Sequence, residues 1–134
     1  MKNGLKYAHI FSKILAFSGA YVPIRIVDNG GVPVDDGVSD VAFQCRVFGD
    51  PMVLATSDLD PRFIFHGLKE SGKEIPRIFM TEGSEDFLLT ENRSMRDFLQ
   101  KKKRILCISK IKELMIGTFG ISIWMKRLLF WQNK

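Results

Sequence analysis

The sequence is poor in cysteine and histidine and lacks any long apolar run. Its 134 residues include two cysteines, Cys45 and Cys107, which lie far apart without the spacing of metal ligands. They indicate buried or incidental free thiols in a reducing compartment such as the cytoplasm. No uninterrupted apolar stretch reaches about 18 residues, so no membrane-spanning helix is expected. The residues around Lys2 and Lys6 likewise lack the apolar run of a signal peptide.

The sequence does contain enough apolar residues for a packed core. Hydrophobic residues make up 46% of the chain, with 11 phenylalanines, so a disordered chain is not expected. A length of 134 residues allows at most one domain, and no internal repeat is present.

Charge is distributed unevenly along the chain. Residues 1–100 hold 11 Lys and Arg against 14 Asp and Glu, a balance of −3, whereas residues 101–134 hold nine against one, a balance of +8. One interpretation is a small basic binding protein that contacts nucleic acid or an anionic membrane surface through residues 101–134, which include Trp124 and Trp131. The interpretation we favour is that the two parts of the chain did not arise under the same constraints.

The order of predicted elements alternates strands with helices. Short apolar runs predict buried strands at 13–17, 75–80 and 105–109. Helical periodicity predicts helices at 2–11, 40–48, 61–71 and 91–101. Glycines and prolines predict a long loop over 21–40. This alternation is typical of an α/β fold with parallel strands.

Apolar residues at helical spacing predict which side of each helix faces the core. They are Val41, Cys45 and Phe48, then Phe63 and Leu68 with Ile64 as a further candidate, and finally Met95, Phe98 and Leu99. Ser57 or Asp58 is expected to cap the helix at 61–71, and Gly72 to end it.

Four segments resemble a known family. They are residues 3–7, residues 11–20, Arg46-Val47-Phe48-Gly49-Asp50-Pro51, and Gly83-Ser84-Glu85-Asp86-Phe87-Leu88 with Asn92-Arg93. Through them the chain resembles an esterase family of the α/β-hydrolases, which includes tributyrin-esterase-like carboxylesterases and S-formylglutathione hydrolases. The resemblance implies a partial α/β-hydrolase fold with a doubly wound, mostly parallel sheet. Residues 1–103 would be the C-terminal portion of the domain, with 21–60 as a cap-like region.

The resemblance also implies that Asp86 is the acid of a Ser-Asp-His triad in the intact parent enzyme. Such an acid accepts a hydrogen bond from the imidazole, fixes its tautomer and stabilises the imidazolium. The alternative is that Asp86 is a turn residue that binds backbone N–H groups. The implied substrate is a small ester, and no metal or organic cofactor is implied.

The other two members of a triad are not evident. The sequence has no G-x-S-x-G nucleophile elbow, and no histidine follows His66. Ser18 and Ser84 lack the glycine two residues before them, so Ser18 is expected in a strand-end turn. His9 and His66 precede the acid and are expected to be surface or partly packed helix residues. Glu85 is expected to be solvated.

These absences predict that the chain is one part of an esterase. Met1 is expected to be an internal start downstream of the elbow, and residues 104–134 to be an out-of-frame translation. With suitable codons, the shifted frame beneath Leu114 to Ile121 encodes His-Asp-Trp-Asn-Phe-Trp-Asn, similar to the family's histidine segment. We expect no significant esterase activity from the chain alone, and self-association through exposed apolar surface.

Overall fold

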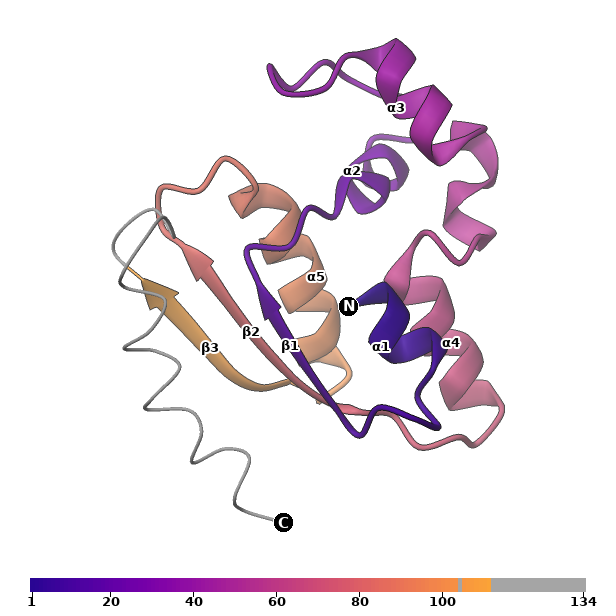
Figure 1. The fold of residues 1–134 in the computed structure, drawn as a ribbon, viewed down its shortest axis with the longest axis vertical. Helices are drawn as coiled ribbons and strands as arrows, with labels where there is room; N and C mark the ends of the chain where they lie inside the picture. Colours follow the sequence, from indigo (N-terminus) through magenta and orange to yellow (C-terminus); the bar gives the residue numbers. More distant parts are fainter. Residues whose placement is uncertain (104, 112–134) are drawn as a thin grey trace.

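The fold is built on a three-stranded parallel sheet (Figure 1). A computed structural model describes residues 1–103 and the strand at 105–111. The strands are β1 (Lys13–Phe17), β2 (Arg77–Gly83) and β3 (Ile105–Ile111), in the order β1-β2-β3. Both pairings are parallel, which confirms the expectation drawn from the alternation of elements. The interpretations that rest on residues 112–134 lie outside the described residues.

The helices α1 (Lys2–Lys6), α4 (Pro61–Glu70) and α5 (Leu89–Lys101) share one core with the sheet. In register, Ile14 of β1 lies opposite Ile78 of β2, and Ala16 lies opposite Met80. These four side chains face the buried residues of the helices, which are Leu5, Phe65, Leu68, Met95 and Leu99. Alternate residues of β1 and β2 thus line one continuous core.

A close approach between α1 and β1 explains the glycine inside this short helix. A Cβ atom at Gly4 would lie 2.6 Å from Cγ1 of Ile14. Only glycine leaves room for the backbone of α1 at this distance from the strand. The helix ends at Lys6, earlier than predicted, and Ile10 is 66% exposed because it lies beyond the helix.

The prediction of a loop over 21–40 was wrong in its first part. Residues Val22–Asp28 form the helix α2, with Pro23 in its first turn and Ile24 and Ile26 buried. Proline fits the first turn of a helix because its missing N–H has no partner there in any case. Asn29 is the C-cap residue at which this helix ends.

The rest of the cap-like region holds two helical segments. The α-helix α3 (Val41–Phe48) was predicted, but its inward residue is Gln44, whereas Val41 is 44% exposed. Periodicity alone did not find this residue, because a polar side chain is buried there through hydrogen bonds. The 3₁₀ helix η1 (Pro51–Thr56) was not predicted.

Helices α4 and α5 lie close to their predicted positions. Asp60 caps α4, accepting a hydrogen bond from the backbone N–H of Arg62 at 2.8 Å, so the caps predicted at Ser57 or Asp58 were wrong. The buried phenylalanine of α4 is Phe65, while the predicted Phe63 is 45% exposed. None of the helices in the described part of the chain has the length and apolarity to cross a membrane.

Candidate functional site

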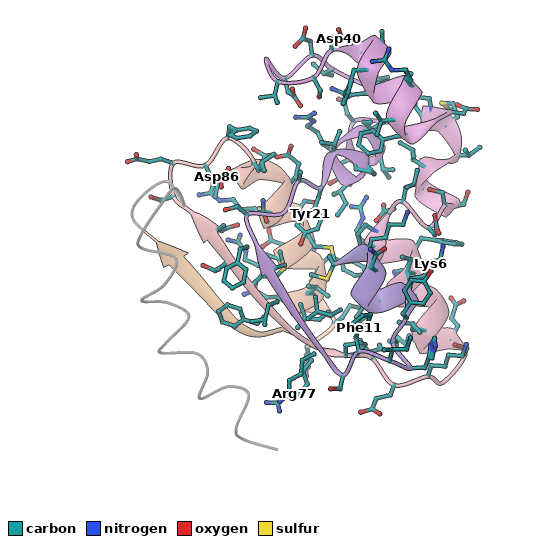
Figure 2. The ribbon with its side chains drawn as sticks, viewed as in Figure 1. Lys6, Phe11, Tyr21, Asp40, Arg77 and Asp86 are labelled. Carbon is teal, nitrogen blue, oxygen red and sulfur yellow. The ribbon has the colours of Figure 1, made fainter. Side chains whose placement is uncertain are left out.

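Two turns meet at the carboxyl ends of β1 and β2. One is the turn at Ser18 and Gly19 after β1, and the other runs over residues 83–88 after β2. Figure 2 shows Asp86 and Tyr21 at this end of the sheet, and Phe11 and Arg77 at the opposite end. In open α/β sheets the carboxyl ends of parallel strands are where ligands bind. This edge is therefore the candidate site.

Asp86 lies half-buried in the second turn. Its Oδ1 atom accepts a hydrogen bond from the backbone N–H of Leu88 at 2.9 Å, and its carbonyl oxygen accepts one from the N–H of Leu89 at 3.0 Å. The carboxylate thus has the turn-forming contact that the alternative interpretation described. Its role as a catalytic acid stays a prediction.

Asn92, in the first turn of α5, connects the two turns. Its Oδ1 accepts from the N–H of Gly19 at 3.0 Å, and its Nδ2 donates to the carbonyls of Gly19 at 2.9 Å and Leu88 at 2.8 Å. The residue is 1% exposed. The sequence placed Thr90 or Asn92 near the start of this helix and Asn92 within a matching segment, but it did not reveal this contact. A polar residue in the first turn of a helix resembles an ordinary capping residue.

The turn after β1 has a constrained backbone. Ser18 has a positive φ of 43°, and its N–H donates to the carbonyl of Thr81 in β2 at 3.0 Å. A Cβ atom at Gly19 would lie 2.5 Å from Cζ of Tyr21, so this position requires glycine. Tyr21 is buried, and burial raises the pKa of its hydroxyl. Ser18 lies in the strand-end turn where the sequence placed it.

Two buried carboxylates near this edge are paired with arginines. Glu82, at the end of β2, lies 3.1 Å from a guanidinium nitrogen of Arg96 in α5. Glu91 lies 3.2 Å from a guanidinium nitrogen of Arg25 in α2. A buried charge is tolerated when it is paired, and these ion pairs link β2 and α2 to α5. They offer no clear acid or base for a reaction.

Arg25 also joins the cap-like region to this edge. Besides Glu91, it contacts the carboxylate of Asp36, which accepts further hydrogen bonds from the N–H groups of Val38 and Ser39. The hydrogen bond from Arg25 and those from the backbone hold the pKa of Asp36 well below its usual range.

A hollow of about 370 Å³ lies between α2, the following loop and the start of α5. Its walls include the apolar side chains of Ile26, Val32 and Val34, together with Arg25 and Glu91. Thr90 also lines it, four residues after Asp86. The hollow adjoins the start of α5, the helix that follows the turn of Asp86.

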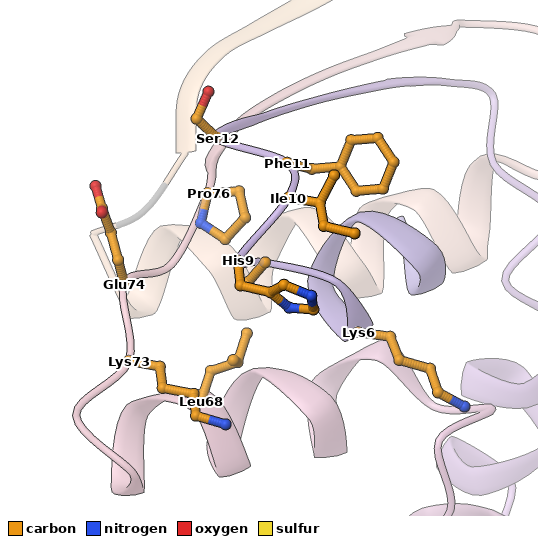
Figure 3. Close-up of a pocket in the computed structure, with 10 residues that line it drawn as sticks. Lys6, His9, Ile10, Phe11, Ser12, Leu68, Lys73, Glu74 and Pro76 are labelled. Atoms are coloured by element: carbon orange, nitrogen blue, oxygen red, sulfur yellow. The ribbon is translucent and has the colours of Figure 1, made fainter.

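The two candidate histidines lie elsewhere. His9 is exposed and lines a larger hollow, of about 500 Å³, near the amino ends of β1 and β2 with Lys6, Phe11 and Lys73 (Figure 3). The full length of β1 separates it from Ser18. His66 lies on α4, with its ring 5.5 Å from that of Phe98. Neither is placed as the base of a triad with Asp86.

The remaining candidates show no binding chemistry. Ser84 and Glu85 are exposed in the turn, and Cys45 is a half-buried free thiol. Within residues 1–103 and 105–111, no three His, Cys, Asp or Glu side chains are placed to hold a metal ion.

Comparison with known proteins gives a match in sequence and a match in fold. The chain is 36% identical over 104 residues to an acetyl esterase from Caldicellulosiruptor saccharolyticus, a match that covers 76% of this chain and 38% of the esterase. The crystal structure of the S-formylglutathione hydrolase FrmB from Staphylococcus aureus superposes with a TM-score of 0.65 at 17% identity. That match covers 97% of this chain and 48% of the hydrolase.

The chain therefore spans less than half the length of either protein. No protein-family model matches it. The structural match shows the fold, and the sequence match links the chain to an esterase. Together these findings relate the chain to the esterase-like α/β-hydrolases.

Proposed function

We propose that this chain is the acid-bearing part of a serine ester hydrolase, with Asp86 as the acid of the triad. The observation that supports this most directly is the position of Asp86 in the turn that ends β2, at the carboxyl edge of a parallel sheet. The 36% identity to an acetyl esterase supports the proposed reaction class, hydrolysis of a small ester.

In such an enzyme the acid acts through a histidine. A serine hydroxyl attacks the ester carbonyl while the imidazole takes its proton, and backbone N–H groups bind the oxyanion. Asp86 would accept a hydrogen bond from the imidazole N–H and stabilise the imidazolium. The imidazolium then gives this proton to the alcohol as the ester C–O bond breaks, and water hydrolyses the acyl-enzyme to release the carboxylic acid. The hollow beside Thr90 would hold a part of the ester, under residues 21–60 as the cap.

The printed chain contains no nucleophile elbow and no histidine after His66, so we expect it to be inactive alone. The purified protein should hydrolyse a short-chain nitrophenyl ester no faster than its Asp86→Ala variant. Hydrolysis that Asp86→Ala abolishes would overturn this part of the proposal.

A chimera tests the role of Asp86 positively. The 104-residue segment of the Caldicellulosiruptor acetyl esterase that matches this chain is replaced by the matching residues of this chain. We expect the chimera to hydrolyse nitrophenyl acetate, and Asp86→Ala to lower kcat by about 10³- to 10⁴-fold. The matched control is Glu85→Ala, an exposed acid in the same turn, which should leave kcat unchanged. An active chimera that is indifferent to Asp86→Ala would refute the assignment.

The nucleotide sequence around the gene tests the proposed relation to an intact esterase. We expect an upstream frame that encodes G-x-S-x-G and a shifted frame beneath Leu114 that encodes the His-Asp-Trp segment. An ordinary start before Met1 with no such frames would contradict a broken esterase gene. The basic binding protein would then become the leading interpretation.

The compartment and the association state are part of the same proposal. Cys45 is a free thiol, which agrees with the reducing cytoplasm. Exposed apolar side chains such as Met52 and Phe87, 75% and 68% exposed, favour self-association. Sedimentation of the purified protein as a monomer at all concentrations would contradict the second statement.

A further inference from the structure

The side-chain amide of Asn92 uses all of its hydrogen-bonding groups on the two turns of the candidate site. Its acceptor and one donor form a reciprocal pair with the N–H and the carbonyl of Gly19. Its other donor binds the carbonyl of Leu88. These partners leave one orientation for the amide, because the N–H of Gly19 requires an oxygen and the two carbonyls require a nitrogen.

The backbone N–H and the carbonyl of Leu88 connect Asp86 with Asn92. The N–H of Leu88 donates to Oδ1 of Asp86 at 2.9 Å, while its carbonyl accepts from Nδ2 of Asn92 at 2.8 Å and from the backbone N–H of Asn92 at 3.1 Å. A shift of Leu88 therefore changes the contact that orients the carboxylate of Asp86. Asn92 acts on that carboxylate through a single residue.

The hydrogen bonds of Asn92 to Gly19 reach a turn that has little freedom to move. The N–H of Ser18 is bonded to Thr81 in β2, and the ring of Tyr21 fills the space beside Gly19. The bond from Asn92 to Gly19 therefore fixes the start of α5 relative to the end of β1. Gly19 and Asn92 are 73 residues apart in sequence.

We propose that Asn92 is a positioning residue, which sets the orientation of the Asp86 carboxylate relative to the turn after β1. The proposal rests on the proposed function for its catalytic meaning, since it names what holds the acid of the triad. A helix cap with no further role would stabilise α5 alone. The contact across to Gly19 is what distinguishes a positioning role.

Amide hydrogen exchange in the present chain, measured by NMR, tests this role without any enzyme activity. Asn92→Leu removes all three side-chain hydrogen bonds at nearly constant volume. We expect exchange at the N–H groups of Gly19 and Leu88 to accelerate by about 10- to 100-fold more than at Met80 inside β2. The matched control is Gln100→Leu, at an exposed position of the same helix, which should leave all three rates unchanged.

A second variant tests the proposal if Asn92→Leu does not fold. Asn92→Asp keeps an acceptor for Gly19 but turns a carboxylate oxygen toward two carbonyls. Leu88 should then exchange faster, while Gly19 stays close to the original protein. In Asp86→Ala, exchange at Leu88 should accelerate and exchange at Gly19 should not, because Asp86 lies at the end of this series of contacts.

The outcomes separate this proposal from the proposed function. Equal acceleration at Gly19, Leu88 and Met80 would mean that Asn92 contributes only to overall stability, and the positioning role would be wrong. An unchanged rate at Leu88 would also refute it. If instead the chimera shows that Asp86 is not the acid, a local effect at Leu88 would still show that Asn92 orients this carboxylate.

Discussion

The sheet with its covering helices and the cap-like region at residues 21–60 are stabilised in different ways. In the first, apolar side chains such as Ile78, Met95 and Leu99 are fully buried between strands and helix. In the second, α2 and η1 bury Ile26 and Leu54, but much of the apolar surface is exposed, with Val38 at 72% and Met52 at 75%.

Polar contacts hold much of the cap-like region. Nε2 of Gln44 donates to the carbonyls of Val34 and Ser39, and Asp36 binds Arg25 and two backbone N–H groups. Hydrogen bonds contribute less net free energy than the burial of large apolar side chains. The cap-like region should therefore open at a lower free energy than the sheet.

The largest effect should come from truncating the core. Phe65 is fully buried, with its ring 5.3 Å from that of Phe98. Phe65→Ala should lower the free energy of unfolding by about 3–5 kcal/mol, measured by urea denaturation. Phe43→Ala, at a 44% exposed position of α3, is the control and should change it by less than about 0.5 kcal/mol. Similar losses for the two variants would abolish the contrast between the regions.

A smaller effect should come from Gln44 in the cap-like region. Gln44→Leu removes the donor to the carbonyls of Val34 and Ser39 and should cost about 0.5–1.5 kcal/mol, the net contribution of a typical hydrogen bond. The loss should show as faster hydrogen exchange within residues 34–48, while amides of β2 keep their protection. If β2 loses protection to the same extent, the cap-like region and the sheet unfold as one unit.

Acid should weaken the same region through Asp36. Its pKa is lowered in the folded protein, so its contribution to stability is present above the unfolded value of about 4 and is lost as the pH falls below that value. The stability difference between the original protein and Asp36→Asn should therefore shrink below about pH 4. The amide resonance of Ser39, whose N–H binds Asp36, should stay constant from pH 7 to about 4. A midpoint above pH 4 would contradict the lowered pKa.

The smallest effect should come from the exposed ion pair between Lys6 and Asp58, each with its side chain 44% exposed. Asp58 raises the pKa of Lys6, but water and salt screen a pair at this exposure. Lys6→Gln should leave the urea midpoint unchanged within error, at both low and high salt. A clear loss at low salt would show that α1 depends on charge for its docking to α4.

Much of the sheet and of α5 was predictable from the sequence, because their signals are local. The apolar run at 13–17 and the periodicity of Met95 and Leu99 hold in the structure. The cap-like region was less predictable. Gln44 is buried only because Val34 and Ser39 supply acceptors, and no hydrophobic pattern encodes that.

The same division applies to the candidate site. The position of Asp86 in a turn after a buried strand could be predicted, since a buried strand and a polar turn leave a local pattern. The contact of Asn92 with Gly19 could not, because it exists only once parallel pairing of β1 with β2 brings their carboxyl ends together. A contact between residues 73 positions apart depends on that pairing, which short-range pattern does not specify.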